Sequence, residues 1–207
     1  MDALYKLFIN NEEKECLFFI IFNSWNENCP EFFKNESQRN NFIMQEAGWV
    51  DQGSNSVHQK SGRMWMYNQF DGQVLNDIFE LIQSYQDLNT EEDFEKLRHP
   101  AFFTRAITNV IGIRVLQGNW SGEYEGGKVP WYWKASEEII SGAVESGSST
   151  KYGQCWVFSA VTVTFCRALG LACRSVTNKG SAHDYGANLE IDYYVDESDM
   201  KEYRVFF

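Results

Sequence analysis

The chain has 207 residues, of which 16% are aromatic, so it can form one domain with a core of large rings, and extensive disorder is excluded. Its 29 acidic and 18 basic residues give a net charge of −11, which argues against a nucleic-acid partner because phosphate binding depends on basic patches. The longest strongly apolar run, residues 17–22, is far shorter than the ~20 residues of a transmembrane helix, so we expect no membrane span.

The first half of the chain contains one expected strand and one expected helix. Residues 17–22 are apolar and have a length suited to a buried strand. The polar residues 52–61 are interpreted as a loop rather than a domain boundary. After the turn at Asp71-Gly72, apolar residues recur at helical spacing and predict a helix with one face in the core: Val74, Leu75, Ile78, Phe79, Leu81 and Ile82.

The second half is dominated by an apolar helix, expected from Gln154 to Leu169. Apolar side chains occupy every face of this segment and Arg167 is its only charge, which predicts a centrally buried helix. Gly170 is suited to its C-terminal cap. Three strands are expected to follow, at residues 173–177, at 189–195 and from 203. Because the chain ends within the last of these, we expect it to be part of a longer protein.

Cys155 is the first candidate for chemistry. It follows Gly153-Gln154 at the start of the expected helix, where unpaired N–H groups and the helix dipole favour a nucleophilic thiolate. The alternative is a buried structural cysteine, which is common and inert. Disulfide-framework spacing and CxxC pairs are both missing, which favours a reduced intracellular setting for all five cysteines: Cys16, Cys29, Cys155, Cys166 and Cys173.

The residues around Cys155 belong to a longer pattern. Lys151-Tyr152-Gly153-Gln154-Cys155-Trp156-Val157-Phe158 is followed by residues 166–171 and by 176–184, which include Ser-Ala-His-Asp. These segments resemble the catalytic core of animal transglutaminases, and residues 17–25, 35–54, 65–72 and 115–120 resemble further segments of that family in the same order. The resemblance implies an α+β, papain-like fold in which a central buried helix carrying the cysteine packs on an antiparallel sheet. Residues 1–207 would form the N-terminal part of that core, without the flanking β-sandwich and β-barrel domains.

The resemblance also implies roles for two residues. Cys155 would attack a glutamine side chain of a protein substrate, release ammonia and form a thioester, which the amine of a lysine or a small primary amine then attacks. Trp120 would donate its indole N–H to the oxyanion, an interaction worth about 3 kcal/mol. From its sequence context alone, Trp120 would be interpreted as a packing ring.

The resemblance leaves the general base outside this chain. His58 and His99 are interpreted as surface residues, and His183 belongs to the Ser-Ala-His-Asp motif rather than to the catalytic position. In the family pattern the catalytic histidine and aspartate come beyond Phe207. We therefore expect a C-terminally incomplete core that is nearly inactive by itself.

A calcium site is expected near Asp184. In the resembling family an aspartate and a later asparagine at these places bind calcium, so Asp184 and Asn188 are candidate ligands, with Glu190 offering its backbone carbonyl. The alternative is an ordinary Asp-Tyr-Gly-Ala-Asn turn. A second family site, rich in asparagine and aspartate, is replaced here by the apolar residues 109–113, so we do not expect that site to persist.

Two other functional classes compete with the crosslinking enzyme. One is a transglutaminase-like structural or scaffold protein that has lost the reaction, and the other is a cysteine protease of similar architecture. Retention of both Cys155 and Trp120 argues against the first, and the Gly-Asn-Trp and Ser-Ala-His-Asp motifs argue against the second. We expect a cytoplasmic protein, with extracellular action after unconventional release as the alternative.

Overall fold

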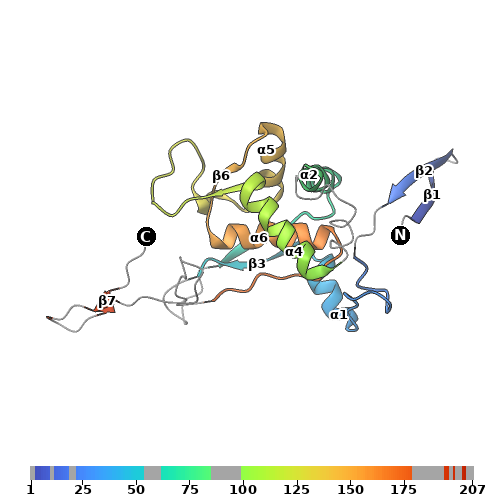
Figure 1. Ribbon diagram of the computed structural model, residues 1–207, viewed down its shortest axis with the longest axis horizontal. Coiled ribbons are helices and arrows are strands. Elements are labelled where there is room, and N and C mark those ends of the chain that lie inside the picture. Colours follow the sequence, from blue (N-terminus) through green and yellow to red (C-terminus); the bar gives the residue numbers. More distant parts are fainter. Residues whose placement is uncertain are drawn as a thin grey trace.

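The structure, a computed structural model, describes residues 3–9, 12–18, 22–53, 62–84, 99–178, 194–195, 198 and 202–203. Helix α6 (Cys155–Ala168) passes through the middle of the body, and α4 (Pro100–Val110) crosses it (Figure 1). Helices α2 (Gly72–Gln83) and α5 (Glu137–Ser146) lie to one side of α6 and strand β3 (Ala47–Asp51) to the other. Among the described helices, none has the length and apolar character of a membrane span.

The remaining elements are short. They are β1 (Ala3–Ile9), β2 (Glu12–Phe18), α1 (Glu36–Arg39), a π-helical turn (Asn40–Met44), β4 (Gly62–Met66), a second π-helical turn (Ile111–Val115), β5 (Leu116–Gly118), a 3₁₀ turn (Pro130–Tyr132), β6 (Thr150–Gly153), β7 (Tyr194–Val195) and β8 (Glu202–Tyr203).

The described strands associate in four pairs rather than in one sheet. Strands β1 and β2, β3 and β4, and β7 and β8 are antiparallel, whereas β5 and β6 are parallel. The antiparallel pair that packs on α6 is β3–β4, through β3. Parallel strands cannot be joined by a tight turn, and the connection from β5 to β6 accordingly contains the 3₁₀ turn and α5.

The two helices expected from the sequence are confirmed. Asp71 caps α2 by accepting hydrogen bonds from the backbone N–H groups of Gln73 and Val74. Helix α6 begins one residue after the expected start and ends one residue before the expected end. Gly170 follows it with a φ of +87°, the left-handed conformation that glycine adopts most easily and that often ends helices.

Helix α6 is buried because α4, β3 and the first π-helical turn all pack on it. Phe165 in α6 and Phe103 in α4 are buried, and the Phe103 ring lies 4.9 Å from that of Phe22. The polar Thr164 is accommodated in the core because its hydroxyl lies 2.7 Å from the Ser136 hydroxyl, to which it is hydrogen-bonded. This burial supplies the hydrophobic free energy that holds the helix in place.

The strand expected at residues 173–177 is wrong, since residues 171–178 have no regular secondary structure. The backbone groups of this segment bind separate partners instead of a neighbouring strand. The N–H of Cys173 donates to the carbonyl of Phe42, and its carbonyl accepts from the Arg167 guanidinium, 2.9 Å away. Arg167 is itself buried, contacts the Gln45 carbonyl and lies over the Tyr67 ring. The contacts of the buried Arg167 side chain therefore help to determine the course of this segment.

The other expected strands are only partly within the described residues. Residues 17 and 18 belong to β2, while residues 19–21 lie outside the described part and Phe22 is a buried core residue outside any strand. Of the strand expected at 189–195, the structure describes Tyr194–Val195, which form β7 and pair with β8. The expected loop at 52–61 is described only at Gln52 and Gly53, which have no regular secondary structure.

Candidate active site

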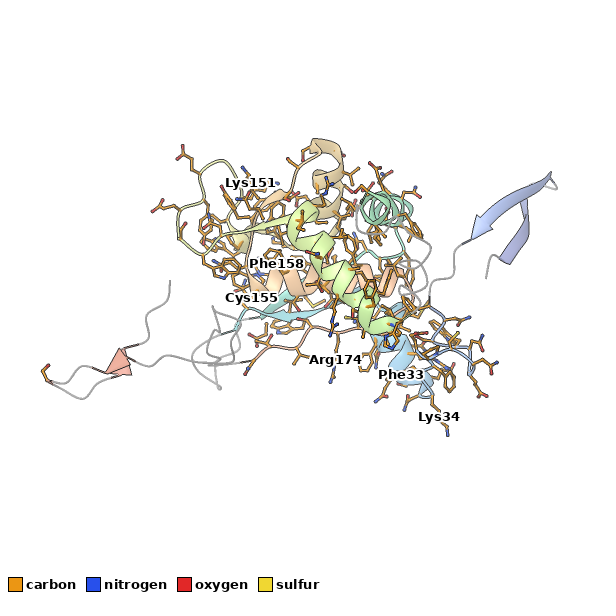
Figure 2. All side chains as sticks on the ribbon, viewed as in Figure 1. Phe33, Lys34, Lys151, Cys155, Phe158 and Arg174 are labelled. Atoms are coloured by element: carbon orange, nitrogen blue, oxygen red, sulfur yellow. The ribbon has the colours of Figure 1, made fainter. Side chains whose placement is uncertain are left out.

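Cys155 is the first residue of α6, and it is exposed (Figure 2). The carbonyl of Gln154, the N-cap residue, accepts hydrogen bonds from the N–H groups of Val157 and Phe158. The first N–H groups of a helix have no acceptor within the helix, and they lie at the positive end of its dipole. The exposed sulfur is therefore in a position where developing negative charge is favoured, which argues against the alternative of a buried structural cysteine.

The strands β5 and β6 bring Trp120 and Cys155 to the same end of their parallel pair. The two strands run parallel, with Gly118 opposite Gly153. The pairing extends one residue further, because the N–H of Asn119 donates to the carbonyl of Gly153 at 3.0 Å. Trp120 and Cys155 each follow within two residues of this bond. Residues 35 positions apart in the chain are thus held side by side by backbone hydrogen bonds.

The Trp120 ring lies against the helix that carries Cys155. It stacks on the ring of Phe158, with 6.4 Å between the ring centres and 4° between the planes. Phe158 follows Cys155 by three residues, so both project from the same side of α6. Trp120 remains 60% exposed, so it is not a core packing ring. An exposed thiol and an exposed indole thus share one end of α6.

Gly118 provides the space for this arrangement. A Cβ atom on Gly118 would lie 2.5 Å from the Cζ3 atom of the Trp120 ring and 3.4 Å from Cε2 of Phe158. The ring therefore covers the glycine, and a larger residue would displace it.

Two further residues contact this site that the sequence did not single out for it. The side-chain amide of Gln154 donates to the carbonyl of Asn119 at 3.0 Å and to the hydroxyl of Tyr124 at 3.1 Å. The Tyr124 ring meets the ring of Trp131 edge-on, with 5.5 Å between ring centres. Gln154 lies inside the motif that drew attention to Cys155, but neither periodicity nor spacing pointed to Tyr124.

Comparisons with known proteins agree with this geometry. The family model for the Transglutaminase-like superfamily matches residues 122–202. Protein-glutamine gamma-glutamyltransferase 4 of Mus musculus is 35% identical over 197 residues, covering 94% of this chain and 28% of that protein. Protein-glutamine gamma-glutamyltransferase K of Homo sapiens is 36% identical over 187 residues, covering 87% of this chain and 22% of that protein. Over most of its length the chain is thus similar to proteins of the transglutaminase family.

A solved structure supports the same assignment. The crystal structure of red sea bream transglutaminase matches with a TM-score of 0.67 and 33% sequence identity, over 72% of this chain and 23% of that one. The expected α+β, papain-like transglutaminase core is thereby confirmed. The chain spans only about a quarter of the length of these relatives.

The residues expected to bind calcium, Asp184, Asn188 and Glu190, lie outside the described residues. Within the part that is described, no group of three or more histidine, cysteine, aspartate or glutamate side chains could hold a metal ion. At the place of the second family site, α4 continues directly into the π-helical turn, and Val110 and Ile111 are buried in the core. Val110 and Ile111 therefore offer no side-chain oxygen to a calcium ion.

Of the three histidines, only His99 lies within the described residues, and His58 and His183 lie outside them. His99 is exposed, and it is the N-cap residue of α4 without a side-chain capping hydrogen bond. This agrees with its interpretation as a surface residue. We therefore assign His99 no role in the candidate site.

A second pair of thiols lies at the opposite end of α6 from Cys155. Cys166 is only 3% exposed, and its hydrogen bond with Cys173, together with burial, raises its pKa well above the usual thiol value. The same hydrogen bond lowers the pKa of Cys173, which is half-buried. The described thiols of this chain are therefore chemically unequal.

This inequality predicts the order in which the thiols react with iodoacetamide near neutral pH. Cys155 should be alkylated first because it is exposed, and Cys173 more slowly because it is half-buried. Cys166 should be alkylated last because it is both buried and held in the protonated form. Peptide mass spectrometry of samples taken over time measures the three rates separately. Faster modification of Cys166 than of Cys155 would contradict the described geometry.

Replacing Gly118 by alanine should displace the Trp120 ring from Phe158. The new Cβ atom needs the space that the ring occupies, whereas the same change at Gly112, where no atom lies within 4 Å, meets no neighbour. Near-ultraviolet circular dichroism should therefore change for Gly118→Ala and stay constant for the control, Gly112→Ala, with far-ultraviolet spectra unchanged in both. Equal spectra for Gly118→Ala and the unsubstituted chain would show that the ring does not cover Gly118 in solution.

Proposed function

We propose that this chain is part of a protein-glutamine γ-glutamyltransferase, which forms isopeptide bonds between glutamine and lysine side chains of proteins. The observation that carries the proposal is the exposed Cys155 at the start of α6, with the exposed Trp120 ring stacked one helical turn away. A nucleophile and a hydrogen-bond donor at one accessible place are what acyl transfer requires.

The proposed reaction proceeds in two steps. The Cys155 thiolate attacks the carboxamide carbon of a glutamine side chain, the C–N bond breaks, and the nitrogen leaves as ammonia after taking a proton, so that a thioester remains. A primary amine then attacks the thioester carbon and loses a proton, the C–S bond breaks, and the thiolate is regenerated. We assign the proton transfers to a histidine, oriented by an aspartate, both expected beyond Phe207, so the 207-residue chain alone should be nearly inactive.

Trp120 contributes in both steps. Each attack places negative charge on the former carbonyl oxygen, and a fixed indole N–H stabilises that charge more than it stabilises the ground state. The stacking on Phe158 restricts the ring, so little reorganisation is needed when the charge appears.

Removal of the indole N–H should reduce turnover in the full-length protein that contains this chain. Trp120→Phe should lower kcat for incorporation of a labelled primary amine into a glutamine-bearing protein by about 10² to 10³-fold. Cys155→Ala should abolish incorporation. Trp49→Phe, a matched change at a ring that is 58% exposed on β3, should leave kcat unchanged.

The same assay distinguishes the competing functions. No incorporation by the unsubstituted protein would support a transglutaminase-like scaffold, and cleavage of the protein substrate without incorporation would support a protease. Either result would contradict the proposed reaction.

We also propose that the enzyme depends on calcium, bound by the Asp184 carboxylate, the Asn188 amide oxygen and the Glu190 carbonyl. The support is the family resemblance and the preference of calcium for such oxygen ligands. The pattern of unpaired cysteines supports a cytoplasmic location, since the described thiols Cys29, Cys155, Cys166 and Cys173 form no disulfide.

Calcium binding can be measured on the 207-residue chain without reference to its activity. Titration calorimetry with calcium chloride should give a saturable signal, and Asp184→Asn should weaken the affinity by about tenfold or more because it removes a charged ligand. Asp196→Asn makes the same change at a nearby acidic residue without an assigned ligand role and should have no effect. Equal weakening by both substitutions would indicate a general charge effect rather than this site.

A further inference from the structure

The side chain of Gln154 does not cap the helix that follows it. It is the N-cap residue of α6, yet the side chain makes no capping hydrogen bond. Short polar side chains such as serine, threonine, aspartate and asparagine are preferred at an N-cap because their oxygen reaches the following N–H groups. The longer glutamine extends instead across to the loop that follows β5, where its amide nitrogen donates to Asn119 and Tyr124. Both N–H bonds of the amide are thereby used.

Asn119 is consequently held on both sides of its backbone. Its N–H donates to the Gly153 carbonyl and its own carbonyl accepts from the Gln154 amide. Its side chain closes a tight turn, in which the carboxamide oxygen accepts from the N–H of Ser121 and the amide nitrogen donates to the carbonyl of Glu123. The residue directly before Trp120 is thus anchored to the residues directly before Cys155.

Tyr124 forms the other end of this connection. Its hydroxyl accepts from Gln154, and its ring is restrained by edge-on contact with Trp131 and by the Tyr152 ring, whose centre is 6.1 Å away. The turn from Asn119 to Tyr124 contains Trp120 and is therefore fixed at both ends by one amide group. That amide belongs to the residue next to the nucleophile.

We propose that Gln154 is a positioning residue that holds the Trp120 indole in register with Cys155, acting through Asn119 and Tyr124 rather than on the substrate. The proposal rests on the proposed acyl-transfer function as far as its effect on catalysis is concerned. Its effect on the position of Trp120 is independent of that function. Without the amide, the strand pairing still brings the loop near α6, but the loop loses the two hydrogen bonds that tie Asn119 and Tyr124 to the residue before Cys155.

The informative substitution is Gln154→Met. Methionine has a similar length and no charge, so it removes both hydrogen bonds without placing a carboxylate beside Cys155. Because a misplaced donor weakens transition-state stabilisation, kcat for amine incorporation in the full-length protein should fall by about 10 to 100-fold, with little change in KM. Gln117→Met is the matched control, since Gln117 is exposed on the neighbouring strand β5, and it should leave kcat unchanged.

The structural part of the proposal is measured by the indole ¹H–¹⁵N resonance of Trp120 in the 207-residue chain, assigned through Trp120→Phe. Gln154→Met should shift or broaden this resonance, and Gln117→Met should not. The rate of Cys155 alkylation should be unchanged in both, which shows that the nucleophile itself is intact. Should Gln154→Met unfold the chain, Tyr124→Phe removes one of the two bonds from the opposite side and should cause smaller changes in the same direction.

The outcomes separate this inference from the proposed function. A shifted Trp120 resonance together with reduced kcat supports both. An unchanged resonance overturns the positioning role, whether kcat falls or not, because Gln154 would then not act through Trp120. A shifted resonance in a protein that incorporates no amine in its unsubstituted form supports the positioning of Trp120 and contradicts the proposed reaction.

Discussion

The hydrogen bond from the Asn119 N–H to the Gly153 carbonyl is the interaction on which the site depends. It is the last bond of the parallel pairing between β5 and β6, and beyond it the two segments diverge into a loop and a helix. Trp120 lies on the loop and Cys155 on the helix. The ends of two paired strands therefore set the relative position of two side chains, while the pairing itself is made entirely by backbone atoms.

This pairing has a fixed geometry only because α6 is held firmly in the core. The helix is surrounded by α4, β3 and the π-helical turns, and its interior residues such as Val161 and Phe165 are fully buried. At its far end the buried Arg167 binds two backbone carbonyls and the Tyr67 ring. A buried guanidinium without such partners would be costly, so these contacts also determine the course of the chain after the helix. The end of α6 that carries Cys155 is thus exposed, whereas the interior of the helix is buried.

The site combines this rigid framework with exposed aromatic rings. Trp120 and Trp131 are both more than half exposed, although large rings are normally buried. Their orientations are nevertheless restrained, by the Phe158 ring in one case and the Tyr124 ring in the other. Exposed but restrained groups suit the proposed function, in which the site would meet side chains of other proteins without rearranging.

Much of the framework could be predicted from local sequence. The helices that became α2 and α6 follow from apolar periodicity, their ends from Asp71 and Gly170, and the exposed Cys155 from its place at a helix start. These features depend on residues within a few positions of one another, where propensity and capping act directly. The strand predicted at 173–177 failed for the opposite reason: Phe42, far away in the sequence, and Arg167, which contacts with Gln45 and Tyr67 hold in the core, bind the backbone of Cys173.

The sequence by itself determined that a central helix would begin with a cysteine, and its motifs pointed to Trp120 as that cysteine's partner. Only the tertiary structure decided how the two are held together: through parallel strand pairing, through the space left by Gly118, and through the Gln154 amide that reaches Asn119 and Tyr124. The physical reason is that the strand pairing and the Gln154 hydrogen bonds join residues 30 or more positions apart. Their hydrogen-bond partners and free space come into being only when the intervening chain has folded.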